Sequence, residues 1–190
     1  MGLIIEDGLG TGKSASVDDE NRLRTLAITM SMEHESNQAH GDAYNVIFSA
    51  KPSEADACIF YMKNTDDKDM VVKGLTLGAT DPTANETVEF KIGDSGTRDS
   101  ATALTPTNLN AGSGKAATGT FESGVKLNAG TLTGGTIFER IVLAGATDRI
   151  SSLWNFNQDV ILPKNGVLTI YISGSFSGTY YGTVNIHYHD

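Results

Sequence analysis

The chain has 190 residues, of which 39% are hydrophobic, and a formal net charge of −9. This length suits one domain with appendages and a substantial hydrophobic core. The acidic balance argues against nucleic-acid binding, which needs a basic face to neutralise phosphates. The apolar runs are too short to cross a bilayer, and the first residues lack the apolar region of a signal peptide. We therefore expect a protein that is made in the cytoplasm, is not exported, and has neither a membrane nor a nucleic acid as its partner.

Residues 1–42 differ from the rest of the chain because they contain too few large apolar residues to build a core. A glycine-rich segment at residues 8–12 and a charged run at residues 18–24 follow a short apolar patch. Ordering glycines costs backbone entropy, so we expect an extended arm that becomes ordered on another surface. Within it, residues 23–29 alternate as a strand would. The residues expected to contact a partner are the apolar ones of this arm: Leu3, Ile4, Ile5, Leu9, Leu23, Leu26 and Ile28.

The rest of the chain, residues 43–190, is a series of short β patterns separated by turn residues. Strands are predicted over residues 44–48, 57–63, 71–77, 87–92, 136–143, 158–162, 167–173 and around 184–188. Pro163 to Gly166 has the composition of a turn, and Gly74 is a candidate bulge. Residues 93–135 are rich in small residues and form either long loops or strands with small side chains. This pattern predicts an all-β fold, either a sandwich or a barrel, after the extended arm. Of these we expect a jelly-roll-like β-sandwich.

Alternation within the strands predicts which side chains form the core. The run at residues 57–63 is apolar throughout, as in a strand covered on both faces, and it contains the single cysteine, Cys58, as a buried and inert thiol. One cysteine also excludes an intrachain disulfide and a cysteine metal cluster. The side chains expected to point inward from the alternating strands are Val88, Phe90, Ile92, Leu168, Ile170, Ile172, Val184, Ile186 and Tyr188.

Three stretches near the start of the chain carry a resemblance to known proteins: IEDGLGTGKSASVD (residues 5–18), NRL (21–23) and GDAYNV (41–46). They resemble the beginning of tailed-bacteriophage virion proteins. These are head-decoration (cement), head-fibre and related structural proteins that join an extended arm to a β-sandwich. The resemblance implies a place in the virion, attachment to the major capsid protein or another virion protein, and assembly with copies of itself as a homotrimer.

Two motifs look catalytic but fail their spacing tests. Residues 10–14 read like the end of a phosphate-binding loop, yet Asp7 stands where the motif needs its first glycine. Residues 93–96 read like the nucleophile loop of chymotrypsin-like proteases. That chemistry needs a histidine base oriented by a carboxylate, and the upstream histidines, His34 and His40, lie in a polar tract. We expect a turn at residues 93–96, and no catalytic residue or cofactor site.

Two further groups of side chains leave alternatives open. His187 and His189 are two residues apart on a strand and could meet one metal, but a third ligand is missing, so we expect a polar outer face and no metal. Trp154, Tyr171, Tyr180 and Tyr181 could form a sugar-stacking platform, although packing in a core or between subunits is more common. Residues 66–69 are expected to be a solvated turn instead of a calcium loop.

The arm, the series of strands and the resemblance together predict a non-enzymatic phage structural protein that decorates or stabilises the capsid. Attachment would occur through the N-terminal arm. The alternative is a carbohydrate- or receptor-binding module of a head or tail fibre. A hydrolase or metal enzyme is the weakest hypothesis.

Overall fold

The computed structural model describes residues 5–6, 14–17, 23–24, 36–80, 86–143, 150–173 and 178–189. The chain divides into two compact units, Met1–Ser31 and Met32–Asp190. In the first unit a small antiparallel sheet is formed by three short strands, β1 (Ile5–Glu6), β2 (Ser14–Val17) and β3 (Leu23–Arg24). The strand expected at residues 23–29 is therefore described over its first two residues, and the remainder lies outside the described residues.

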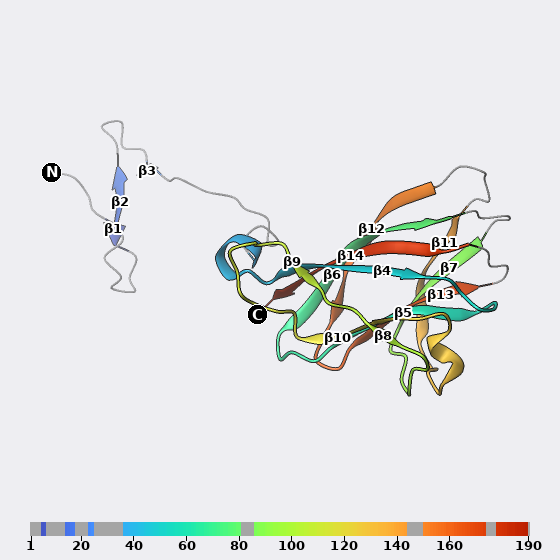
Figure 1. Ribbon diagram of the computed structural model, residues 1–190. Coiled ribbons are helices and arrows are strands. Elements are labelled where there is room, and N and C mark those ends of the chain that lie inside the picture. The colour runs from blue at the N-terminus through green and yellow to red at the C-terminus, as the bar shows by residue number, and fades with distance from the viewer. Residues whose placement is uncertain are drawn as a thin grey trace. The chain divides into compact units, whose positions relative to one another are not determined.

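The second unit is built from two antiparallel sheets (Figure 1). One has six strands in the order β11 (Thr136–Leu143), β7 (Glu86–Ile92), β13 (Val167–Ser173), β5 (Ala57–Asn64), β10 (Gly119–Ser123) and β8 (Thr102–Ala103). The other has five, in the order β12 (Ile150–Leu162), β6 (Asp69–Ala79), β14 (Tyr180–His189), β4 (Ala43–Ala50) and β9 (Thr107–Asn108). The predicted all-β sandwich is confirmed.

The core lies between the two sheets and is almost entirely apolar. Phe48 of β4 packs against Phe60 of β5 with ring centroids 4.8 Å apart, so the aromatic contact joins the two sheets. The side chains predicted to be buried along β13 and β14 are buried, because both strands lie in the middle of their sheets. The same holds for the apolar part of β5, which is covered on both faces as predicted. Ile92 is an exception and the prediction for it was wrong: it is 38% exposed, because it is the last residue of β7, beyond the core.

The segment between β7 and β11 is mostly loop, but it adds strands to both sheets. β10 pairs with β5, and the short β9 pairs with β4. A single helical turn, η2 (Leu127–Ala129), follows β10. Of the two alternatives left open for residues 93–135, long loops and strands of small residues, both occur. Phe121, the one large aromatic side chain of β10, points into the core.

A bulge beside Gly74 changes the register of the five-stranded sheet. Gly74 is opposite Asn185, whereas Val72 is opposite Ile186, so Lys73 is the extra residue of β6 at this point. The sequence analysis placed the bulge at Gly74, one residue after its position at Lys73. It lets both Val72 and Leu75 face the core although they are an odd number of residues apart.

The outer face of the five-stranded sheet is covered at one end. The helical turn η1 (Ser36–His40) contacts β14 near its C-terminal end (Figure 1). His187 lies on the face opposite Val184 and Ile186, as the alternation predicts, yet it is only 2% exposed. The expected exposed polar face is therefore wrong for His187 and correct for His189, which is exposed. Alternation within β14 indicates the face on which His187 lies, but not whether that face is covered.

Candidate functional site

A second buried cluster lies on the outer face of the six-stranded sheet. Leu127 and Leu132 come from the segment that follows β10, and they pack on side chains that point away from the main core. This segment therefore covers part of the sheet face as a layer of its own. The cluster consists of Cys58, Tyr61, Leu127, Leu132, Val167 and Tyr171.

The covering segment is fixed by its pairing with the loop after β7. Ser95 and Thr133 exchange two backbone hydrogen bonds of 2.9 Å each. The amide of Thr131 donates to the carbonyl of Thr97 at 3.1 Å. Gly96, with φ 115°, allows this close approach, since a Cβ there would lie 2.3 Å from the carbonyl oxygen of Thr131. Residues 93–96 thus connect β7 to an isolated bridge between Ser95 and Thr133, and they hold the covering segment instead of forming the predicted turn.

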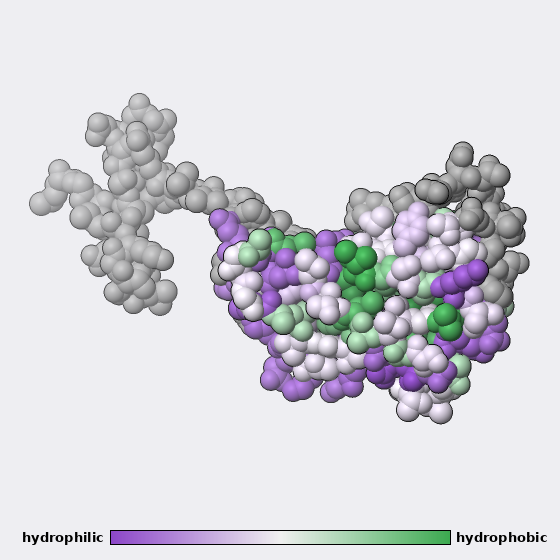
Figure 2. Space-filling view, in the orientation of Figure 1, coloured by the Kyte–Doolittle hydropathy of each residue, from purple (hydrophilic) through white to green (hydrophobic). Residues whose placement is uncertain are grey.

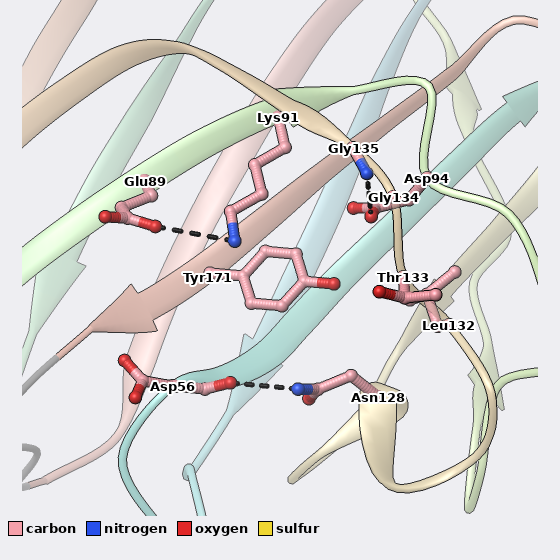
Figure 3. A pocket seen from close by; sticks show the side chains of 10 residues that line it. All are labelled: Asp56, Glu89, Lys91, Asp94, Asn128, Leu132, Thr133, Gly134, Gly135 and Tyr171. Atoms are coloured by element: carbon pink, nitrogen blue, oxygen red, sulfur yellow. Dashed lines mark hydrogen bonds and ion pairs between the residues drawn. The ribbon is translucent and has the colours of Figure 1, made fainter.

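A polar pocket of about 310 Å³ opens between this segment and the sheet, and we call it the Tyr171 pocket (Figure 3). Its floor is buried and contains Glu89, Asp94, Leu132 and Tyr171, whereas Asp56, Thr133 and Gly134 form an exposed rim. Lys91 and Asn128 line its sides and are half-buried. The pocket therefore combines a fixed floor with a solvent-accessible edge.

Tyr171 of the floor is in contact with Lys91 at the side of the pocket. The ammonium of Lys91 lies 3.8 Å from the centroid of the Tyr171 ring, a cation–π contact between neighbouring strands (Figure 3). Burial, and then the neighbouring Cys58 and Asp94, raise the pKa of the Tyr171 hydroxyl. This hydroxyl therefore stays protonated at neutral pH. The other tyrosine of the cluster, Tyr61, is covered in the same way by Arg98, at 4.2 Å from the ring centroid.

Glu89 is a buried carboxylate whose charge is balanced by two cations. Its Oε1 accepts hydrogen bonds from Arg140 Nη2 at 2.6 Å and Nε at 3.1 Å. Its Oε2 lies 3.5 Å from the ammonium of Lys91. Arg140, Glu89 and Tyr171 lie side by side across three strands, because Glu89 is in register with both of the others.

Asp94 is the second buried carboxylate of the floor, and both of its oxygens are hydrogen-bonded. Oδ1 accepts the backbone N–H of Gly135 at 2.8 Å, which ties the covering segment to the sheet (Figure 3). Oδ2 accepts the hydroxyl of Thr169 at 2.5 Å. Asp94 thus connects the covering segment to β13. Among the described residues, its hydrogen-bond partners do not include a histidine.

The opposite side of the pocket is organised by Asn128. Its Oδ1 accepts the backbone N–H of Cys58 at 2.8 Å, and its Nδ2 donates to the carbonyl of Asp56 at 3.0 Å (Figure 3). The carboxylate of Asp56 accepts the hydroxyl of Ser173 at 2.9 Å. Asp56 has φ 56°, a conformation that Asp and Asn tolerate better than most residues. The burial of Cys58 raises its pKa, in agreement with the predicted inert thiol.

A second pocket, of about 290 Å³, lies at the other end of the sandwich. Asp42, the last residue of the predicted arm, is buried there, and its carboxylate pairs with Lys115 at 2.9 Å and Lys68 at 3.5 Å. Lys115 therefore contacts a carboxylate of its own chain. The backbone N–H of Lys68 donates to Oδ1 of Asp66 at 3.0 Å, a local hydrogen bond typical of a turn. Residues 66–68 connect β5 to β6, whereas Asp69, which the predicted turn included, is the first residue of β6.

The structure separates the residues that the sequence grouped as aromatic and metal candidates. Tyr180 is fully buried in the main core, Tyr181 is half-buried, and Tyr171 lies on the other sheet. The side chain of Trp154 lies outside the described residues. Among the residues that the structure describes, no three side chains of His, Cys, Asp or Glu are grouped closely enough to hold a metal ion.

Most of the predicted contact residues of the arm cannot be placed. Ile5 belongs to β1 and Leu23 to β3. The others lie outside the described residues, namely Leu3, Ile4, Leu9, Leu26 and Ile28. The part of the chain that the structure describes contains no helix with the length and apolar character needed to cross a membrane.

Exposed apolar side chains are scattered over the second unit. Ile47 and Ile161 are 63% and 57% exposed on the five-stranded sheet, and Val142 is 57% exposed on β11. Figure 2 shows apolar residues on the visible face as small groups between polar ones.

In comparisons with known proteins, no protein-family model, curated protein or solved structure matches this chain.

Proposed function

We propose that this protein is a non-enzymatic structural component of a phage particle, which decorates or stabilises the capsid and attaches through its N-terminal arm. The observation that carries the proposal is the order of the strands in the sandwich. The division of the chain into two units and the resemblance of its first residues support it as well.

The eight main strands pair in a nested pattern. In chain order they are β4, β5, β6, β7, β11, β12, β13 and β14. The outermost pair in this order is β4 with β14, followed inward by β5 with β13, β6 with β12 and β7 with β11. Nested pairing of this kind is a feature of jelly rolls, an architecture common among viral capsid domains and lectins, and it supports the proposal. The proposal therefore includes a jelly-roll sandwich, with β8, β9 and β10 as additions at the sheet edges.

The contacts of Asp42 indicate where an arm can be removed without harm to the sandwich. Its backbone carbonyl accepts the N–H of Tyr188 at 3.0 Å, and its carboxylate pairs with two lysines. A truncation that removes Asp42 would therefore damage the core unit. Removal of residues 1–31 keeps these contacts and follows the division between the two units.

The test compares the full-length chain with residues 32–190 on particles of the encoding phage that lack the protein. Thermal unfolding is expected to show that both forms are folded, and co-sedimentation is expected to show that only the full-length chain binds. A full-length variant with Ile47→Ser, a change of an exposed residue on the sandwich, is the matched control and should bind normally. Unchanged binding of residues 32–190 would place the attachment surface on the sandwich.

Assembly as a homotrimer is part of the same proposal and comes from the resemblance. Three arms on one assembly raise one another's effective concentration at a particle surface, so binding should be much tighter than for a single arm. The molar mass of the full-length protein in solution, measured by light scattering, tests the assembly directly. A monomer mass at micromolar protein would remove avidity from the proposal.

A further inference from the structure

We infer that the Tyr171 pocket is a binding site for a neutral sugar. This function is additional to attachment by the arm and does not depend on it. The inference rests on the shape of the pocket, on the way its charges are already balanced, and on the kinds of hydrogen-bonding groups that remain at its rim.

The pocket has the shape of a ligand site. Its volume of about 310 Å³ is at the lower end of the range of about 300–1,000 Å³ for small-molecule sites. The floor is held by cross-strand contacts and by the hydrogen bond from Gly135 to Asp94, so the pocket is formed before any ligand arrives. Such a site loses little conformational entropy on binding.

The charges of the floor disfavour an ionic ligand. Glu89 is paired with Arg140 and Lys91, and both oxygens of Asp94 accept hydrogen bonds from the protein. A bound cation would compete with Arg140 and Lys91 for Glu89. An anion would face the carboxylates of Glu89, Asp94 and Asp56. A neutral ligand avoids both costs, since burying an unpaired charge is expensive.

The groups around the pocket match the hydroxyls of a sugar. Each hydroxyl can donate one hydrogen bond and accept others. Asp56 offers carboxylate acceptors, the amide of Asn128 and the ammonium of Lys91 offer donors, and Thr133 offers a hydroxyl. Gly134, with φ 94° and no neighbouring atom within 4 Å of a Cβ position, leaves the backbone of the rim open.

The experiment uses the full-length chain and a fixed set of soluble probes. Saturation-transfer NMR and titration calorimetry would be carried out with D-glucose, D-galactose, D-mannose and N-acetyl-D-glucosamine. Glucuronate serves as the anionic comparison and glucosamine as the cationic one. We expect at least one neutral sugar to bind more tightly than either charged sugar.

Two substitutions locate the binding and a third controls for charge. Asp56→Asn keeps the size and the backbone preference of the residue, and Lys91→Met keeps most of the aliphatic stem. Each is expected to weaken binding of the neutral sugar at least tenfold. Lys164→Met also breaks a lysine–carboxylate pair, with Asp67, but does not line the pocket, so it should leave the affinity unchanged.

Three results would overturn the inference: no saturation transfer from any neutral sugar at millimolar concentration, tighter binding of a charged sugar, or an affinity that neither Asp56→Asn nor Lys91→Met changes. Loss of particle attachment in the truncated protein is a separate result. If the truncated protein still binds the sugar, sugar binding and particle attachment are independent functions.

Discussion

The hydroxyl of Tyr180 on β14 donates a hydrogen bond to Oε2 of Glu86 on β7, so a buried tyrosine and a buried carboxylate connect the two sheets of the sandwich. Glu86 is 1% exposed and Tyr180 is fully buried. Carboxylates are rarely buried without partners. Tyr180 therefore stabilises the fold both by packing in the core and by its hydrogen bond to Glu86.

Tyr180→Phe should lower the free energy of unfolding by about 1–3 kcal/mol, because a buried acceptor loses a donor. Chemical denaturation followed by fluorescence or circular dichroism measures this value. Tyr181→Phe is the matched control, since Tyr181 is the half-buried neighbour on the other face of the strand. Its effect should stay within about 0.5 kcal/mol. Equal effects of the two variants would mean that the Glu86 contact contributes little.

The protein should also lose stability at alkaline pH. Burial raises the pKa of five tyrosines above the ordinary value, namely Tyr44, Tyr61, Tyr171, Tyr180 and Tyr188. When an acid has a higher pKa in the folded chain than in the unfolded chain, the difference adds to stability. This contribution is complete at any pH below the unfolded pKa, which is about 10 for tyrosine. This contribution decreases as the pH rises further, because the unfolded chain releases its phenolic protons first.

The measurement is a titration of tyrosinate absorbance alongside circular dichroism. We expect the buried phenols to ionise well above pH 10, together with unfolding, whereas the chain in denaturant should titrate near about 10. Ionisation of all tyrosines near that value, with the native circular dichroism signal retained, would contradict the prediction.

Strand bounds could be predicted where local signals mark both ends. β13 begins directly after the turn at Pro163 to Gly166, in which the N–H of Gly166 donates to the carbonyl of Pro163 at 2.7 Å, and its predicted bounds agree with the structure. β11 agrees as well. β12 was predicted as residues 158–162, but it extends from Ile150 to Leu162, because its first part has no clear alternation. β10 was not predicted, since its residues are mostly small and polar.

The Tyr171 pocket could not be found from the sequence. Glu89 and Asp94, Asn128, and Tyr171 come from three separate parts of the chain, and they meet because β13 lies between β7 and β5. The order of strands in a sheet depends on long-range pairing, which local alternation does not encode. A partial signal was present in Glu89, a charged residue between two core positions, whose burial requires a partner charge.

His187 shows the same limit on a smaller scale. Alternation placed it correctly on the face away from the core, but it is 2% exposed, because burial depends on packing that alternation does not encode. His187→Ala should lower the free energy of unfolding by about 1–3 kcal/mol, as is usual for a buried residue. His189→Ala, a change of the exposed histidine two residues later, should stay within about 0.5 kcal/mol. Matching small effects would contradict the burial of His187, and a loss that a divalent metal reverses would establish a metal site.

We expect that Gly182, in β14, cannot be replaced by a residue with a side chain without loss of stability. It faces the core opposite Phe48, and a Cβ at this position would lie 2.7 Å from the Phe48 ring and 2.6 Å from the carbonyl oxygen of Thr76. The ring could shift, but the carbonyl belongs to the neighbouring strand and cannot move without distorting the sheet. Gly182→Ala should therefore lower the free energy of unfolding by about 1–3 kcal/mol, as overpacking of a core does.

The control for this substitution is Gly114→Ala, at an exposed glycine with no atom within 4 Å of its Cβ position. Its effect should stay within about 0.5 kcal/mol. Phe48→Leu removes part of the ring and should reduce the additional cost of Gly182→Ala in a double-mutant cycle, since residues in contact do not act additively. If Gly182→Ala were as stable as the original protein, the close packing of Phe48 over β14 would be wrong. If Gly182→Ala cost as much in the Phe48→Leu background as in the original protein, the strain would come from Thr76 alone.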